Sequence, residues 1–134
     1  MYQSFTDICE MNTSENKKTV VIGASPNPER YGYKATEKLV NQGIETIPLG
    51  VKPGIIGKSV IINDRPAEKG VHTVTLYLNP KNQEECYDYI LSLHPKRIIF
   101  NPGTENPAFA LEANQQGIST TDACTLVLLA TNQY

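Results

Sequence analysis

The most informative segment of this chain reads Thr19-Val20-Val21-Ile22-Gly23-Ala24-Ser25-Pro26-Asn27-Pro28-Glu29-Arg30-Tyr31-Gly32-Tyr33. It begins with a short apolar run rich in β-branched residues, which is typical of a strand buried on both faces of a sheet. A loop of glycine, serine, asparagine and proline follows, and apolar residues then recur at helical spacing. In α/β proteins this order places loop N–H groups and the positive end of a helix against a phosphate. The segment therefore predicts a phosphate-binding turn, although the G-x-G-x-x-G pattern of ordinary dinucleotide sites is absent.

The rest of the chain alternates predicted strands with predicted helices. Further strands are expected at residues 45–49, 72–78, 96–100 and 118–121, with a short edge strand at 59–62. Helices are expected from residue 31 to a stop at Gly43, at 80–93 and at 107–116. We therefore predict an α/β fold with a parallel sheet of about five strands and helices on both faces. The predicted domain is residues 18–134, and residues 1–17 are a polar N-terminal arm with one or two helical turns.

Asn-Pro occurs four times, at residues 27–28, 79–80, 101–102 and 106–107. Asparagine is a favoured N-cap and proline is favoured at the first helical position, so the copies at 27, 79 and 106 predict helix starts. The copy at 101 directly follows a predicted strand. In a parallel sheet all these turns lie at the carboxyl edge, where ligands bind. Each copy is explained either by turn chemistry alone or by a ligand site.

Composition excludes several functional classes. The net charge is −2 and the isoelectric point about 5.7, which gives no electrostatic case for nucleic acid. The apolar runs are far shorter than the roughly 20 residues that cross a bilayer. The first residues are polar and acidic, unlike a signal or transit peptide, so we expect a cytoplasmic protein. The three cysteines are widely spaced and odd in number, which argues against disulfides or a zinc site.

Four positions bear on the ligand. The second strand is followed by Lys52 and has no acid at its end, unlike NAD-binding units. A cation there suits a ribose that carries a phosphate, as in coenzyme A or NADP, or is simply a solvated lysine. Arg30 is either a phosphate ligand or a surface arginine. Tyr31 either stacks on an adenine or packs on the sheet, and Gly23 lets the main chain approach a pyrophosphate.

The loop at residues 101–106 is the second candidate site. Gly103 permits close approach of the main chain, and Thr104 and the amides around it could cradle a ligand group. Glu105 is either an acceptor for a ligand N–H or a carboxylate that suits the helix dipole. Cys124 could be a nucleophile with Asp122 and a histidine, but a small buried hydrophobic residue is the ordinary role of cysteine. We expect no catalytic set and no metal site.

These residues together resemble the CoA-binding domain family, a Rossmann-like domain that also occurs at the start of the succinyl-CoA synthetase alpha subunit. The likeness is strongest to small stand-alone bacterial CoA-binding proteins and covers residues 18 to about 124. The segment at residues 21–33 matches the first loop of the family. The family expects Asn-Pro-Lys after the second strand, where this chain has Gly50-Val51-Lys52. The loop at 101–106 is a divergent form of the glycine loop of the family.

The resemblance implies binding of coenzyme A or an acyl-CoA in an extended pose at the carboxyl edge, without catalysis by this domain. The residues that it implies at the site are Gly23, Ala24, Ser25, Asn27, Arg30, Tyr31, Lys52, Asn79, Pro102, Gly103 and Thr104. Two other functions stay open: a small NADP-binding oxidoreductase, and a partner-binding module with a vestigial nucleotide groove. The acyl group, the pathway, a homo-oligomer and a partner enzyme are not determined by the sequence.

Overall fold

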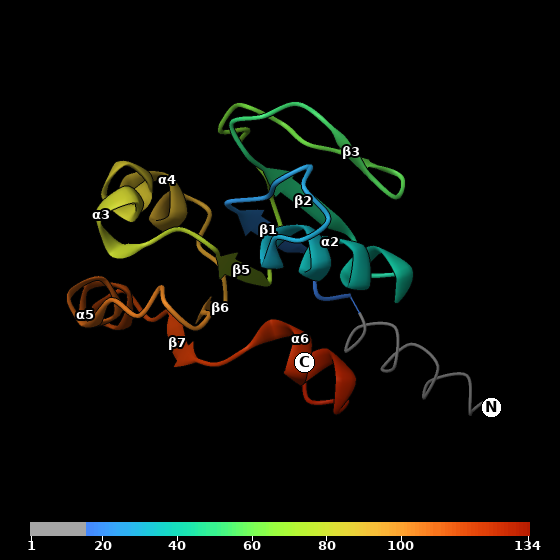
Figure 1. The fold of residues 1–134 in the computed structure, drawn as a ribbon. Coiled ribbons are helices and arrows are strands. Elements are labelled where there is room, and N and C mark those ends of the chain that lie inside the picture. Colours follow the sequence, from blue (N-terminus) through green and yellow to red (C-terminus); the bar gives the residue numbers. More distant parts are fainter. Residues whose placement is uncertain (1–15) are drawn as a thin grey trace.

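A computed structural model describes residues 16–134, which form an α/β domain around one five-stranded sheet (Figure 1). All neighbouring strands are parallel, in the order β2-β1-β5-β6-β7. Their bounds are β1 (Thr19–Ile22), β2 (Thr46–Leu49), β5 (Thr73–Leu76), β6 (Arg97–Phe100) and β7 (Ser119–Asp122). This is the predicted fold class, a Rossmann-like α/β sheet. The predicted N-terminal arm at residues 1–17 lies almost wholly outside the described residues.

Helices cover both faces of the sheet (Figure 1). One face carries α3 (Pro80–Gln83), the 3₁₀ turn η1 (Glu84–Cys86), α4 (Tyr87–Ser92) and α5 (Pro107–Gln115). The other carries α2 (Tyr31–Asn41) and α6 (Thr125–Ala130), which contact each other. The alternation of side chains along each strand divides the core accordingly, because Val20 and Ile22 pack on the α4–α5 side and Val21 on the α2–α6 side. β1 and β5 are buried throughout, as their β-branched sequences predict.

A small antiparallel hairpin, β3 (Ile55–Ile56) and β4 (Ser59–Val60), stands outside the main sheet (Figure 1). Its second strand, β4, covers the first two residues of the edge strand predicted at 59–62. The chain then returns to the main sheet, where Ile62 forms a parallel bridge with Leu49 at the carboxyl end of β2. From this point the segment at residues 63–70 runs past the carboxyl edge and back to the start of β5. This path brings residues far from any motif next to the candidate site.

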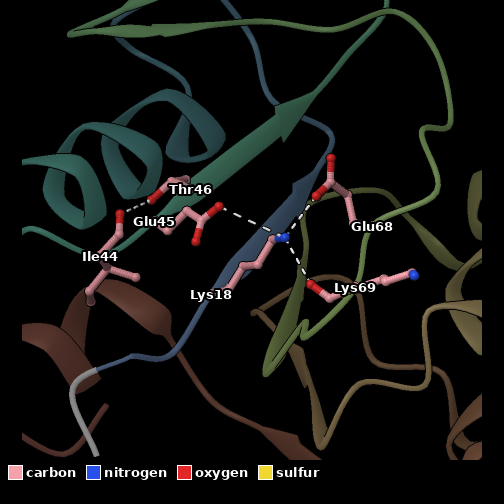
Figure 2. A network of polar contacts seen from close by, with 6 residues as sticks. All are labelled: Lys18, Ile44, Glu45, Thr46, Glu68 and Lys69. Atoms are coloured by element: carbon pink, nitrogen blue, oxygen red, sulfur yellow. Dashed lines mark hydrogen bonds and ion pairs between the residues drawn. The ribbon is translucent and has the colours of Figure 1, made fainter. Parts of the chain in front are cut away.

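Lys18 fixes the opposite, amino edge of the sheet (Figure 2). Its Nζ lies 2.8 Å from a Glu68 oxygen and 3.8 Å from a Glu45 oxygen, and it donates a 2.8 Å hydrogen bond to the Lys69 carbonyl. The Lys18 side chain is only 14% exposed, so these contacts are screened less than a surface pair. They join the segments that enter β1, β2 and β5, and thereby hold the strands in register far from the loops.

Two local predictions differ from the structure. The helix expected at residues 80–93 is interrupted by the 3₁₀ turn, which ends at Cys86, where φ of −104° and ψ of −4° depart from regular α-helical values. The apolar run at residues 126–130, for which no element was predicted, belongs to helix α6. Strand and helix ends otherwise differ from the predicted ones by one or two residues, as is usual where helix ends fray.

Candidate ligand-binding groove

A groove of about 1050 Å³ runs along the carboxyl edge of the sheet. It is bounded by the loops that follow β1, β2, β5 and β6 and by the segment after Ile62. Parallel strands deliver these loops to one edge, which is where ligands bind in open α/β sheets. The structure brings together at this groove all the site residues predicted from the sequence: Gly23, Ala24, Ser25, Asn27, Arg30, Tyr31, Lys52, Asn79, Pro102, Gly103 and Thr104.

Gly23 opens the first loop in a conformation that other residues avoid. Its φ is +98°, and its N–H and that of Ala24 both donate to the Leu49 carbonyl, at 3.0 and 2.9 Å. A Cβ on Gly23 would lie 2.9 Å from the carbonyl carbon and oxygen of Tyr77. The sequence interpretation assigned this glycine to the approach of a pyrophosphate. That reason is incomplete, because the neighbouring β5 loop already requires a glycine here.

Asn27 forms a turn and does not cap the helix. Its side-chain oxygen accepts the Glu29 N–H at 2.9 Å, and its carbonyl accepts the Arg30 N–H at 3.0 Å. The Asn-Pro pair at residues 27–28 is therefore not a helix start, and α2 begins at Tyr31, as the apolar spacing predicted, with Arg30 as its N-cap. Asparagine stabilises both a cap and this kind of side-chain turn, so its position alone did not distinguish them.

The N-terminus of α2 is open toward the groove. Arg30 makes no side-chain cap, and the first main-chain bond of the helix runs from the Lys34 N–H to the Arg30 carbonyl. Within the described part of the chain, the N–H groups of Tyr31, Gly32 and Tyr33 consequently have no acceptor. Gly32 permits a close approach to the first loop, because a Cβ there would lie 2.6 Å from the Gly23 carbonyl. Unpaired N–H groups and the helix dipole together make an anion site.

The two tyrosines of the first turn have distinct environments. Tyr31 is 65% exposed, lines the groove and lies 5.3 Å from the Lys34 ammonium, measured to the ring centroid. Tyr33 packs instead against the α2–α6 side of the core. The interpretation in which Tyr31 packs on the sheet is therefore wrong, and its ring is available to a ligand.

Three basic and two acidic side chains line the groove: Arg30, Lys52, Arg65, Glu29 and Asp64. All five are exposed. Ion pairs among residues 16–134 involve Lys18 alone, so none of the three basic groups has a carboxylate partner there. Sequence reasoning missed Arg65 and Asp64, because no motif marks them and only the path of the chain after Ile62 brings them to the edge. Unpaired cations around an open helix N-terminus favour a multiply charged anionic ligand.

The wall on the α4 side was also missed by sequence reasoning. Asn82, Cys86 and Tyr89 line it, and the Tyr89 hydroxyl donates to the Pro66 carbonyl at 2.7 Å, which attaches the 63–66 segment to α4. Burial raises the pKa of the half-buried Cys86 thiol, and the Arg65 guanidinium, with a nitrogen 4.0 Å from the sulfur, partly opposes this. A raised pKa keeps the thiol protonated and unreactive near neutral pH.

The loop after β6 is held by its own hydrogen bonds. The Asn101 carbonyl accepts the Thr104 N–H at 2.9 Å and the Thr104 hydroxyl at 2.8 Å, while the Gly103 N–H donates to a Glu105 carboxylate oxygen at 2.9 Å. The N–H groups of Gly103 and Thr104 are therefore already used within the loop, and neither is free to bind a ligand as the loop stands. Neither predicted role of Glu105 includes this contact. The loop is a preformed wall with Pro102 and Gly103 exposed.

The residues considered for catalysis do not meet at this groove. Cys124 follows β7 at the carboxyl edge, whereas His72 precedes β5 at the amino edge, where it lines a separate hollow with His94. Neither Cys124 nor Asp122 lines the groove. Residues 16–134 contain no group of three potential metal ligands. Within the same residues, no helix is long and apolar enough to span a membrane.

Known proteins share this fold. A solved structure described as an uncharacterised protein is 50% identical, with a TM-score of 0.86, and the alignment covers 89% of this chain and 98% of that one. A redesigned form of the PH1109 protein is 21% identical with a TM-score of 0.77, covers 96% and 90% of the two chains, and shows the fold alone. The carbamoyl phosphate synthase large chain of Neisseria gonorrhoeae is 27% identical over 92% of this chain, which spans only 12% of that enzyme. A family model described as CoA binding domain matches residues 17–130, and the chain therefore belongs to the CoA binding domain family.

Proposed function

We propose that this protein binds coenzyme A or an acyl-CoA in the groove and performs no catalysis of its own. The observation that carries the proposal is the open N-terminus of α2, which faces a groove lined by the unpaired cations Arg30, Lys52 and Arg65. Coenzyme A carries a pyrophosphate and a separate ribose phosphate, so its charge matches several cations distributed along one groove. Membership of the CoA binding domain family supports the same ligand.

The strand order gives the ligand a direction. Along the carboxyl edge, Lys52 follows β2, the first loop follows β1, and the Asn79 and Gly103 loops follow β5 and β6. We place the ribose phosphate at Lys52 and the pyrophosphate at the first loop and the α2 N-terminus. The pantetheine arm then extends across the loops after β5 and β6. In this pose the ligand lies across the point between β1 and β5. From β1 the chain continues to β2 on one side, and from β5 it continues to β6 on the other side. Ligands usually bind at such a point in parallel sheets.

Calorimetric titration of Lys52→Ala tests this pose. Loss of a charge-assisted contact should weaken CoA binding by about 1–3 kcal/mol. Dephospho-CoA, which lacks the ribose phosphate, should lose little on the same substitution. Lys58→Ala is the matched control, because Lys58 is an exposed lysine of the β3–β4 hairpin that does not line the groove. Equal losses of affinity for both ligands would mean that Lys52 does not contact the ribose phosphate.

The same titration compares CoA with NADP, whose 2′-phosphate would also suit Lys52. Tight binding of NADP with no binding of CoA would replace the proposal by a small oxidoreductase. Binding of neither would favour a partner-binding module. Native mass spectrometry of the freshly purified protein would identify any retained ligand and its acyl group. A cytoplasmic location, and a homo-oligomer or partner enzyme that uses the bound ligand, complete the proposal.

A further inference from the structure

Gln83 connects two loops that line the groove, although it does not line the groove itself. It is fully buried at the end of α3. Its side-chain nitrogen donates 2.8 Å hydrogen bonds to the Leu78 carbonyl, in the loop after β5, and to the Thr104 carbonyl, in the loop after β6. Each acceptor belongs to a residue that lines the groove. One side-chain amide group therefore links two neighbouring loops by hydrogen bonds.

The orientation of this amide is fixed by its partners. Both carbonyls require the NH₂ group, and the side-chain oxygen accepts the Asn106 side-chain N–H at 3.0 Å. Asn106 donates further to the Tyr87 hydroxyl at 2.7 Å and accepts the Phe109 N–H at 3.1 Å. The Tyr87 ring stacks on Phe109, with centroids 4.2 Å apart and planes 7° from parallel. The network is buried and its amide groups are paired, which is the condition under which polar groups make a core rigid.

We propose that Gln83 is a positioning residue that sets the separation of the loops after β5 and β6, and so the affinity for the pantetheine arm of the ligand. The inference rests on the proposed function and on the direction assigned to the ligand. An apolar side chain at this position would leave the Leu78 and Thr104 carbonyls without their buried donor, and the loops would separate to reach water. The subsites for the ribose phosphate and the pyrophosphate belong to other loops and would keep their geometry.

The test is calorimetric titration of Gln83→Met with CoA and with adenosine 3′,5′-bisphosphate, a fragment that lacks the pantetheine arm. We expect the variant to lose about tenfold in affinity for CoA, and less than about twofold for the fragment, since the lost hydrogen bonds support only the arm. Ile90→Val is the control, because Ile90 is fully buried in α4 and its substitution removes one core methyl group without removing a hydrogen bond to either loop. It should lower stability and leave both affinities unchanged.

Two further measurements do not depend on Gln83→Met folding well. Tyr87→Phe removes only the outer hydrogen bond to Asn106 and keeps the stacking on Phe109, so it should weaken CoA by about two- to threefold. Hydrogen–deuterium exchange of ligand-free Tyr87→Phe should be faster at residues 77–79 and 102–106 than in the wild type. Unchanged exchange there would overturn the positioning role without reference to any ligand.

The outcomes separate the two proposals. If the wild type binds neither CoA nor the fragment, the proposed function fails, and this inference fails with it. If the wild type binds CoA and Gln83→Met loses nothing, or loses the same factor for CoA and for the fragment, only the role of Gln83 is overturned. A selective loss for CoA, together with faster exchange in the two loops, supports it.

Discussion

At the scale of single residues, Gly23 combines a positive φ with a close approach of the Tyr77 main chain. We predict that Gly23→Ala lowers the free energy of unfolding by about 1–3 kcal/mol, because φ of +98° is unfavourable for any residue with a Cβ. The new Cβ would also lie 2.9 Å from the Tyr77 carbonyl group. Urea denaturation measures the change.

Gly103→Ala provides the comparison for Gly23→Ala. Gly103 has a similar φ of +91°, but no atom lies within 4 Å of the position of an added Cβ. Gly103→Ala should therefore lose only the unfolding free energy that a positive φ costs a residue with a Cβ. The Gly23 variant should be the less stable of the two. Equal stabilities would mean that contact with Tyr77 contributes nothing and that only the dihedral angle requires a glycine at residue 23.

His72 makes stability depend on pH. Burial, followed by the positive charges of Arg97, Lys17 and Lys96, lowers the pKa of its imidazole. The unfolded chain therefore binds a proton more readily than the folded one, and stability falls as the pH drops below about 6.5. We predict that His72→Asn loses less stability than the wild type between about pH 7.5 and pH 5.5, measured by urea midpoints.

The control for His72 is His94→Asn. His94 is exposed and has a φ of +49°, which asparagine tolerates well. This variant should keep the pH dependence of the wild type. If both variants flatten the curve equally, the acid loss does not arise from the cationic surroundings of His72.

At the scale of elements, the Asn-Pro pairs are not equivalent. Asn79 caps α3 by accepting the Asn82 N–H at 2.8 Å and is exposed, whereas Asn106 caps α5 and its amide is also buried against Gln83 and Tyr87. We predict that Asn79→Ala costs about 1 kcal/mol of unfolding free energy, the usual value for a cap. Asn106→Ala should cost more, since it leaves buried partners unpaired. Chemical denaturation of both variants checks the order, and a larger loss for Asn79→Ala would contradict it.

The elements show what periodicity can and cannot predict. The strands were predicted because β-branched runs such as residues 19–22 have few alternatives when both faces are buried. The 3₁₀ turn at Glu84–Cys86 was not predicted, because a single turn of this kind leaves no distinct mark in the apolar spacing of a helix. The apolar spacing placed the start of α2 correctly at residue 31, but the Asn27-Pro28 pair did not mark it, since Asn27 suits a turn as well as a cap.

At the scale of the whole molecule, the site divides into a part that topology dictates and a part that it does not. Parallel strands bring the loops after β1, β2, β5 and β6 to one edge, so residues next to strand ends could be placed at the groove from the sequence. Arg65 could not, because it reaches the groove through the path of the 63–70 segment, and Cys86 and Tyr89 could not, because they lie on η1 and α4 away from the strand ends. Tertiary contacts of this kind leave no local pattern.

The two described cysteines test the groove and the absence of catalysis together, because they differ in position. Cys86 lines the groove and its pKa is raised by burial, whereas Cys124 lies outside it at the start of α6. We predict that iodoacetamide labels Cys86 slowly near neutral pH, and more slowly still when CoA is bound, since a protonated and covered thiol reacts poorly. Labelling of Cys124 should not respond to CoA.

Peptide mapping after timed labelling measures both rates, with dephospho-CoA as a weaker competitor. Rapid labelling of Cys124 that CoA blocks would contradict the non-catalytic proposal, because it would place a reactive thiolate beside the ligand and make acyl transfer through a thioester the better explanation.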